Sequence, residues 1–445
     1  MWFLNNFFQT VRGVLKMKFT AAGDALVQRR IYDSYEGFDK IRKYIEKGDA
    51  RFFNLETTLN YEGECYASQF SGGTYVRTNP EVFGDMLGFG FNITSFNNNH
   101  TMDFSYEGLL RTIDYVNEYD IPHSGVGRNL AEASAPAYLD TPNGRVAVIS
   151  VNTTFNPAMM AGEQSRRVPG RPGINGIREN KKIQVTKEYF DKINEVGKAT
   201  KINAAKEITR AEGYYPPLPE GVCELGDMQF VLGDECKVIC TPDEKDLERV
   251  KKSIFEAKLQ ADYIMVSVHS HQIEGESKEN PSEMLKILAH FCIDNGANAV
   301  VGHGPHLLRP IEIYKNRPIF YSLGDFVLQL YSISFAPEDF FEKQGLNSDN
   351  TVHELLAKRS NNFTRGLMAQ KVMNETVVPY WETDENGDLT HLELLPLELS
   401  MGGKKSDEGL PFITKDTSFI ERLAEMSKPY GTEIKMKGNV AVCKW

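Results

Sequence analysis

The chain has 445 residues, of which 25% are charged and 41% hydrophobic, an ordinary composition for a folded protein. This composition excludes collagen-like, coiled-coil and wholly disordered chains, while the length allows two or three domains or one large α/β domain with insertions. Lysine and arginine number 50 against 61 aspartate and glutamate residues, which gives a net charge of −11. An acidic chain without a dense basic run is not expected to bind nucleic acid or an anionic membrane surface.

The N-terminal segment, residues 1–19, is rich in aromatic residues but lacks the features of a signal peptide. Asn5, Asn6, Gln9 and Arg12 interrupt its apolar run, and no small-residue cleavage site follows. The apolar stretches of the chain fall short of the roughly 18 residues that a membrane-spanning helix needs. Six scattered cysteines favour free thiols over a disulfide framework. We therefore expect a cytoplasmic protein without a stable membrane anchor.

Short apolar runs, rich in β-branched or aromatic residues, recur along the chain and predict strands. Strands that alternate with helices indicate an α/β layer architecture, in which ligands bind at the carboxyl ends of the strands. Most of the runs end at a polar, chemically capable side chain. In chain order they are 16–22, 51–53, 91–96, 146–151, 263–268, 299–301 and 318–323, with strands again at 389–399 and 432–442. Helical patterns lie between them at 105–119, 247–260 and 281–295.

Two stretches interrupt this alternation. Residues 179–245 hold a lysine-rich, helix-like segment followed by the proline-rich run 214–219, which we interpret as an insertion or lid. Residues 331–374 are predicted to be irregular and are a second candidate lid. We expect a core over residues 1–330 that carries the insertion, while residues 331–445 supply a lid segment and the C-terminal strands that complete the core.

Carboxylate, amide and imidazole side chains gather in or beside the loops that follow the predicted strands. This mixture of ligands suits Zn, Mn, Fe or Co. The strongest single element is Gly-His-Gly-Pro-His at 302–306, where two imidazoles lie three residues apart in a loop stiffened by Pro305. Each element alone also fits a turn, a cap or a core histidine, but together they predict a metal site. The candidates are Asp24, Glu56, Asn99, His100, His269, His271, His303 and His306.

Longer motifs carry a resemblance to a known family. The chain resembles the CapA family of poly-γ-glutamate capsule-synthesis proteins, whose fold is similar to that of the calcineurin-like metallophosphoesterases. The matching segments run from about Lys18 to Phe326. The resemblance implies a four-layer α/β/β/α sandwich with mixed sheets and inserted lid segments. The motifs are 22–24, 54–56, 97–129, 171–178, 266–274 and 296–326, with 427–432 near the C-terminus.

The resemblance also implies roles for individual residues and one or two divalent metals per chain, Mn, Zn or Fe. In the metallophosphoesterase pattern an asparagine ligand precedes a histidine that acts as a catalytic acid, and Asn99 and His100 match this pair. Glu56 takes the place of an aspartate that bridges two metals, and it is longer by one methylene. The remaining implied ligands are Asp24, His269, His303 and His306.

One position departs from the family pattern. Phosphoesterases usually have a histidine two residues after the first aspartate, where this chain has Leu26. Either His271 substitutes for the missing group, or the site holds a single metal, or the second metal binds weakly. His271 is therefore a candidate functional residue, and both Leu26 and Glu56 argue against simple phosphatase activity.

Residues outside the ligand set are candidates for proton transfer and substrate binding. His100 is paired with Asp103, which either orients the imidazole or caps the following helix. Guanidinium groups bind carboxylates and phosphates in bidentate fashion. Arg128, Arg171 and Arg178 are therefore candidate substrate ligands, with a surface salt bridge as the alternative for each.

Three functions fit these features. A metal-dependent hydrolase would cleave peptide, amide or phosphoester bonds of an anionic peptide or polymer in capsule or cell-envelope metabolism. The resembling family also includes metal-dependent peptide epimerases, in which the metal acidifies a Cα–H bond. A third function is non-catalytic binding of poly-γ-glutamate or assistance to its synthesis. Family members with that role are commonly membrane-anchored, whereas we expect no stable anchor in this chain. We therefore favour the hydrolase over this third function.

Overall fold

The computed structural model describes residues 16–445. Residues 1–15 of the N-terminal segment, which we predicted not to be a signal peptide, lie outside the described residues. The chain forms two compact units. One comprises Lys245–Trp445 together with the described part of Met1–Ile177, and the other comprises Arg178–Glu244. The protein is a mixed α/β protein with several mixed sheets. All six cysteines are free thiols, as their spacing predicted.

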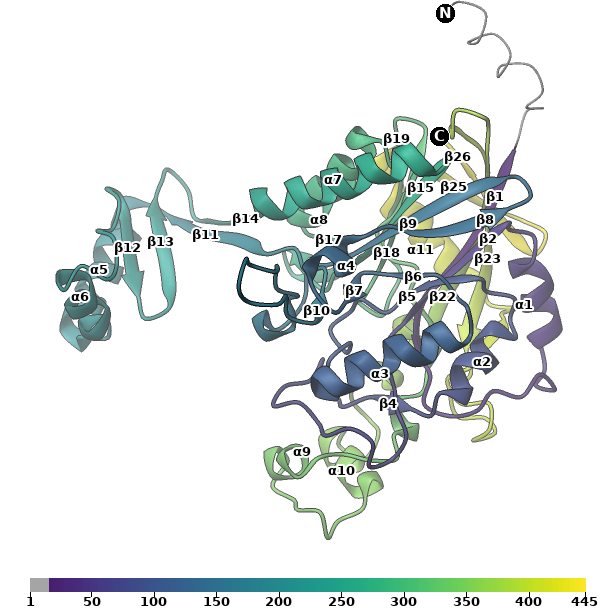
Figure 1. Cartoon of the computed structure of the whole chain (residues 1–445), viewed down its shortest axis with the longest axis horizontal. Coiled ribbons are helices and arrows are strands. Elements are labelled where there is room, and N and C mark those ends of the chain that lie inside the picture. The colour runs from purple at the N-terminus through teal and green to yellow at the C-terminus, as the bar shows by residue number, and fades with distance from the viewer. Residues whose placement is uncertain (1–15) are drawn as a thin grey trace, which may run out of the picture. The chain divides into compact units, whose positions relative to one another are not determined.

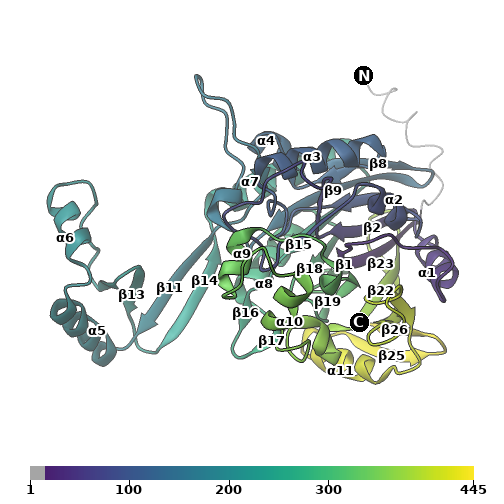
Figure 2. The ribbon, with the colours of Figure 1, turned by 90° about the horizontal axis from the view of Figure 1, so that it is seen from below.

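The larger sheet of the first unit is built around β1 (Met17–Leu26) and has ten strands within the described chain. β1 pairs in parallel with β2 (Ala50–Leu55) and β21 (Asp325–Leu328), and Asp24 stands opposite Asp325 in the second ladder. β1 also pairs antiparallel with β22 (Glu375–Thr383), and Figure 2 shows the C-terminal strands beside it. The other strands are β5 (Ile93–Ser95), β6 (His123–Ser124), β23 (Leu389–Leu399), β24 (Pro411–Ile413), β25 (Glu433–Lys437) and β26 (Val440–Lys444).

The second sheet of this unit has six strands over residues 16–445, and its centre is parallel. There β15 (Tyr263–His269) lies between β9 (Gly144–Asn152) and β18 (Ala299–His303). Because β15 and β18 are parallel and in register, their last residues, both histidines, stand opposite each other. The remaining strands are β8 (Ala137–Thr141), β19 (Ile311–Tyr314) and β20 (Arg317–Phe320).

The two sheets share one hydrophobic core. Phe19 and Phe52 of the ten-stranded sheet belong to the same buried cluster as Val148 and Met265 of the six-stranded sheet. A second buried cluster joins the ten-stranded sheet to three amphipathic helices, whose apolar residues recur every three or four positions. These helices are α1 (Phe38–Ile45), α2 (Glu81–Leu87) and α3 (Ser105–Glu118), while α7 (Glu244–Gln260) and α8 (Glu283–Asn295) lie on the opposite side (Figure 1).

The predicted helices 105–119, 247–260 and 281–295 correspond to α3, α7 and α8. Two other segments differ from expectation. The run 432–442 is a hairpin rather than one strand, because Gly438 turns the chain between β25 and β26 with φ 66°. The stretch 331–374 is not irregular throughout, since it contains α9 (Glu338–Lys343) and α10 (Val352–Arg359).

The second unit has a small core of its own, made of Val185, Cys223 and Phe230. Its first and last strands are antiparallel partners, with Glu179 opposite Pro242, so the chain enters and leaves the unit at adjacent points. The elements of this unit are β11 (Glu179–Val185), α5 (Lys187–Thr200), α6 (Ala204–Ala211), β12 (Val222–Leu225), β13 (Met228–Leu232) and β14 (Lys237–Pro242).

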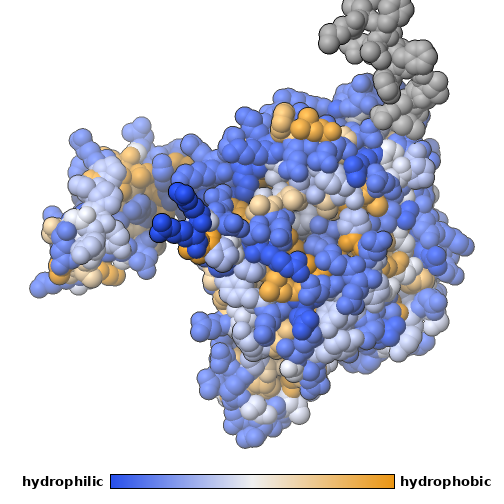
Figure 3. Space-filling model, in the orientation of Figure 1, coloured by the Kyte–Doolittle hydropathy of each residue, from blue (hydrophilic) through white to orange (hydrophobic). Residues whose placement is uncertain are grey.

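The molecular surface is largely polar where it is seen. On the face shown in Figure 3, hydrophilic side chains predominate and apolar ones occur in small groups, as on most protein surfaces. Among the helices of residues 16–445, none combines the length and the apolar character needed to cross a bilayer.

Candidate metal centre

The carboxyl ends of parallel strands bring the predicted ligands together. Asp24 lies near the end of β1, and Glu56 directly follows β2. His269 and His303 are the last residues of β15 and β18. All four side chains are fully buried. Because the two sheets share a core, the ends of their parallel strands open onto the same region, as the strand-end rule predicts.

Asp24, His269 and His303 form the first cluster of potential ligands. Asp24 Oδ1 lies 3.3 Å from Nδ1 of His303 and 3.7 Å from Nδ1 of His269. The side-chain amide of Asn54 and the backbone N–H of Gly304 each donate a hydrogen bond of 2.7 Å to the carboxylate. Although burial opposes it, His303 and His269 hold the pKa of Asp24 well below its usual range. Asp24 is therefore an ionised, rigidly oriented carboxylate.

The other ring nitrogen of His269 faces a second cluster, which contains Glu56 and His271. Nε2 of His269 lies 2.8 Å from Oδ1 of Asn99, 3.1 Å from Nε2 of His271 and 3.7 Å from Oε1 of Glu56. Burial lowers the pKa of His269 to about 4 and that of His271 well below its usual value. Both rings are therefore neutral at neutral pH and can offer a lone pair to a cation.

A third cluster unites Asp24 and Glu56 with His306 and Asp325. Asp325 was not among the predicted ligands, although the end of its strand run was recognised. Its Oδ1 accepts a hydrogen bond of 2.9 Å from Nδ1 of His306. His306 itself has φ 62°, in the left-handed region that non-glycine residues rarely adopt. Such backbone strain is concentrated at functional sites.

Among the described residues, three carboxylate oxygens of this third cluster lack a hydrogen-bond donor. Both oxygens of Glu56 and Oδ2 of Asp325 are buried without a hydrogen-bond donor in the described part of the chain. Burial, with the nearby Asp24 and Asp325, raises the pKa of Glu56 well above its usual value. Burial also raises the pKa of Asp325 to about 6. Buried carboxylates without donors are costly, and a bound cation supplies the missing partner.

The donor set fits a divalent metal. The ligand atoms of each cluster lie within 4.8 Å of one another. Asp24, Glu56 and His269 each belong to two clusters, so the clusters adjoin and can hold one or two ions. Carboxylate and imidazole together suit Zn, Mn or Fe.

Two side chains of the clusters are candidates for the ligand that the resemblance implied at position 26. Leu26 is buried and cannot bind a metal. Asp325 stands on the neighbouring strand, directly opposite Asp24. His271 instead approaches Glu56 and His269. The structure thus provides both His271, which the sequence analysis considered, and Asp325, which it missed.

His100 lies at the edge of the centre. Its Nε2 is 4.0 Å from Oε1 of Glu56, and its Nδ1 is 2.7 Å from Oδ2 of Asp103. Asp103 is fully buried and also accepts hydrogen bonds from the backbone N–H groups of Gly72 and Val76. The N-cap of α3 is Phe104 and has no side-chain cap. Asp103 therefore orients His100 and does not cap the helix.

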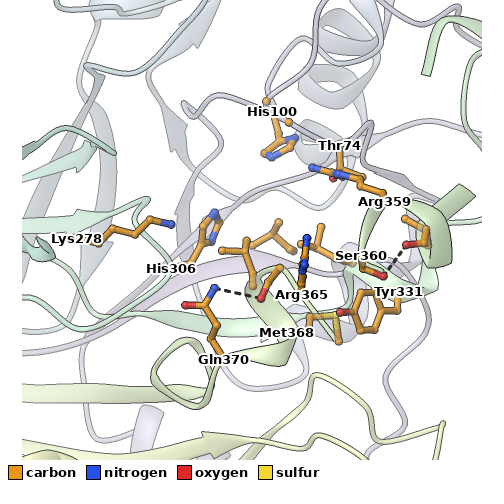
Figure 4. A pocket seen from close by; sticks show the side chains of 17 residues that line it. Thr74, His100, Lys278, His306, Tyr331, Arg359, Ser360, Arg365, Met368 and Gln370 are labelled. Carbon is orange, nitrogen blue, oxygen red and sulfur yellow. Dashed lines mark hydrogen bonds between the residues drawn. The ribbon is translucent and has the colours of Figure 1, made fainter. Parts of the chain in front are cut away.

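An open cavity of about 270 Å³ adjoins the centre. Figure 4 shows His100 and His306 among its lining side chains. The lining also includes Lys278, Arg359 and Arg365. These three residues belong to no motif and follow no predicted strand, so the sequence gives no signal for them.

The three arginines predicted to bind substrate lie elsewhere or have other contacts. Arg128 pairs with Asp114 at 2.9 Å, and Arg171 donates a hydrogen bond of 3.0 Å to the carbonyl of Met160. Neither is among the residues that line the cavity. Arg178 belongs to the second unit, where it pairs with Asp243 at 3.2 Å. The contacts of Arg128 and Arg178 fit the salt-bridge alternative, whereas Arg171 binds a backbone carbonyl. For all three, a role in substrate binding stays a prediction.

Comparison with known proteins places this geometry in context. The family model described as "Bacterial capsule synthesis protein PGA_cap" matches residues 18–330. "Uncharacterized protein y4sH" of Sinorhizobium fredii is 30% identical over 439 residues, which cover 95% of this chain and 92% of the relative. "Capsule biosynthesis protein CapA" of Bacillus anthracis is 23% identical, over 70% of this chain and 60% of the relative. "PGA biosynthesis protein CapA" of Bacillus subtilis (strain 168) is 24% identical, over 68% and 61%.

Proposed function

The chain belongs to the PGA_cap family of bacterial capsule synthesis proteins, as its motifs predicted, and from this premise we propose that it is a metal-dependent hydrolase. Its substrate is an anionic peptide or polymer of the capsule or cell envelope, cleaved at a peptide, amide or phosphoester bond. One observation carries the proposal. Unsatisfied buried carboxylates and neutral imidazoles converge beside an open cavity that His100 and His306 line.

The packing supports the four-layer metallophosphoesterase-like fold that the resemblance implies. Two mixed sheets share a core, and helices flank them on the outside. The candidate ligands lie at the carboxyl ends of the parallel strands, where α/β folds commonly place their sites. This arrangement is consistent with the layer order α/β/β/α.

The residues around the centre have distinct chemical tasks under this proposal. A bound divalent metal supplies a Lewis acid for a substrate oxygen and lowers the pKa of a coordinated water. Asp24, Glu56 and Asp325, with the imidazoles beside them, would hold it. Asp103 keeps the proton of His100 on Nδ1, so Nε2 is the atom that exchanges a proton with the leaving group or the attacking water.

Metal content tests the first half of the proposal. Elemental analysis of the purified chain should find one or two equivalents of Mn, Fe or Zn. Asp24→Ala and His303→Ala should lose this metal, whereas His391→Ala, which alters a histidine paired with Glu393 outside the clusters, should retain it. A folded chain that binds no added Mn or Zn would overturn the proposal.

Turnover tests the second half. The metal-loaded chain should release p-nitrophenol from a phosphodiester or p-nitroaniline from a γ-glutamyl anilide, and a chelator should abolish the release. Incorporation of solvent deuterium at Cα of a peptide without cleavage would show an epimerase instead. Metal binding with neither reaction, and full biological function after loss of the ligands, would indicate a non-catalytic accessory protein.

A further inference from the structure

The cavity beside the centre has two walls of different origin. One wall comes from the segment that matches the family model, residues 18–330, and includes His100 and His306. The opposite wall comes from residues beyond that match, in and after α10, and includes Arg359, Arg365 and Met368. The part of the chain that the sequence analysis predicted as a second lid therefore lines the cavity.

Three cations on these walls lack an acidic partner. Lys278, Arg359 and Arg365 have no carboxylate within ion-pair distance among the described residues. Arg128 and Arg30, by contrast, pair with Asp114 and Asp85 at 2.9 Å and 2.6 Å. In a chain with a net charge of −11, these three unneutralised cations give the walls of the cavity positive groups that can attract an anion.

Arg359 is held in place without being neutralised. Its guanidinium donates a hydrogen bond to the hydroxyl of Thr74 and lies 5.3 Å from the centre of the Phe340 ring. Burial lowers the pKa of Arg359, and no acidic group offsets that effect. The side chain still reaches the cavity lining. A guanidinium that is positioned and partly desolvated gains more from an incoming anion than a freely solvated one.

We propose that Arg359 and Arg365, with Lys278 facing them, form a specificity wall that binds the carboxylates of an acidic peptide substrate. This inference rests on the proposed hydrolase function and names its substrate class. Because the arginines lie outside the family match, the wall can differ between members that share the metal centre.

The arrangement of the cations favours several separate carboxylates over one phosphate. Figure 4 shows Lys278 on one side of His306 and the two arginines on the other. A single phosphate would require the cations to converge on one point. Apolar side chains, among them Leu26, Leu367 and Met368, line the same cavity and suit the methylene groups of an acidic side chain.

Calorimetric titration of the metal-loaded chain with triglutamate, triglutamine and inorganic phosphate tests the wall. Arg359→Gln and Arg365→Gln should each weaken triglutamate binding about tenfold or more, since a charge-assisted hydrogen bond contributes that much. Triglutamine should bind weakly to the parent chain and to every variant. Arg42→Gln, which alters a surface arginine paired with Glu46, should leave triglutamate binding unchanged. Melting curves would verify that the variants fold.

The outcomes separate this inference from the proposed function. Unchanged triglutamate binding in the double variant Arg359→Gln/Arg365→Gln would overturn the wall, even if metal-dependent cleavage occurs. Phosphate binding that exceeds triglutamate binding would overturn the acidic-peptide assignment. Triglutamate binding that depends on both arginines, in a chain without any hydrolysis, would support the wall and contradict the hydrolase. A loss of binding in Arg171→Gln alone would overturn the wall and place the substrate at one of the arginines that the sequence proposed as substrate ligands.

Discussion

Glu56 is the residue whose environment departs furthest from that of an ordinary glutamate. It is fully buried, and neither of its oxygens has a hydrogen-bond donor in the described chain. We expect Glu56→Gln to raise the free energy of unfolding of the metal-free protein at pH 7.5 by about 1–3 kcal/mol, because the variant removes the cost of burying or protonating this group. The same change should reduce the stabilisation by added Mn.

Chemical denaturation of the metal-free and Mn-loaded forms checks this expectation. Glu62→Gln, at an exposed position, is the matched control and should change neither form. If the metal-free Glu56→Gln variant were less stable than the parent, Glu56 would have an intramolecular partner and the metal assignment would lose its main support.

Asp325 gives the metal-free protein a pH dependence of definite sign. Its ordinary pKa is 3.8, and burial raises it to about 6 in the folded chain. Between these two pH values the folded state binds more protons than the unfolded state. The free energy of unfolding of the metal-free protein therefore falls as the pH rises through this window. The shift corresponds to roughly 3 kcal/mol. The rise in Tm on adding Mn should therefore be larger at pH 7.5 than at pH 5, and an equal rise at both values would contradict this account.

Gly72 shows how closely the loop that donates a hydrogen bond to Asp103 packs against the site. A Cβ placed there would lie 2.7 Å from the Asn99 side chain and from the His100 ring. Gly72→Ala should therefore displace both groups and lower turnover by about a hundredfold, since misplacement by about 1 Å has that effect. Gly403→Ala is the control, because its Cβ would meet only Ser400 at 3.4 Å. Initial rates at saturating metal measure the effect. Equal rates for Gly72→Ala and the parent chain would show that the loop moves away without displacing Asn99 and His100.

At the scale of elements, one buried arginine holds the segment that carries His271 and Lys278. Arg309 is fully buried and donates hydrogen bonds to the carbonyls of Ser270, Gln272 and Lys278. His271 lies in the loop that follows β15, and Lys278 lies in β17 (Ser277–Pro281), to which this segment leads. Burial lowers the pKa of Arg309 to about 10, so it remains charged at neutral pH. The segment is therefore positioned by one guanidinium that binds three backbone carbonyls.

We expect Arg309→Lys to lower metal affinity by about ten- to a hundredfold, because an ammonium cannot reach all three carbonyls and His271 is released. Competition with a fluorescent chelator measures the affinity. Arg317→Lys is the control, since Arg317 also binds a backbone carbonyl, that of Asn386, but lies at the amino end of β20. Unchanged affinity in Arg309→Lys would show that His271 does not bind the metal.

The sequence predicted those parts of the site that follow regular strands. Asp24, Glu56, His269 and His303 come together because parallel strands end at one edge, a rule that needs no coordinates. Asp325 follows a glycine after a strand just as Asp24 does, but it was missed because no ligand position of the family pattern was assigned to it. Only the pairing of β21 with β1 places it opposite Asp24.

The cavity wall was harder to predict. Arg359 and Arg365 follow no strand, and their position depends on packing around α10, which local patterns do not encode. Strand and helix positions were largely anticipated from apolar periodicity. The separation of one strand run into the hairpin of β25 and β26 was not, because a single Gly438 decides it.

At the scale of the whole molecule, the second unit should be removable. Arg249 of α7 donates hydrogen bonds to the side chain of Asn175 and to the carbonyl of Gly176. The first unit therefore holds close together the two chain segments that flank the second unit. Replacing residues 178–244 with a short Gly-Ser link should leave metal stoichiometry unchanged and Tm within a few degrees. Elemental analysis and calorimetry measure both, and loss of metal would show that the second unit contributes to the centre.

The central position of β1 has a consequence for the order of events in the cell. Translation delivers Asp24 and its parallel neighbour β2 early, but two other partners of β1, the strands β21 and β22, emerge only late in synthesis. The histidines of β15 and β18 also come late in the chain, so the first carboxylate is made long before most of the other candidate ligands. Under the proposed function, the ion would be acquired only after most of the chain has been made, and the metals available to the folded chain would decide which element fills the centre.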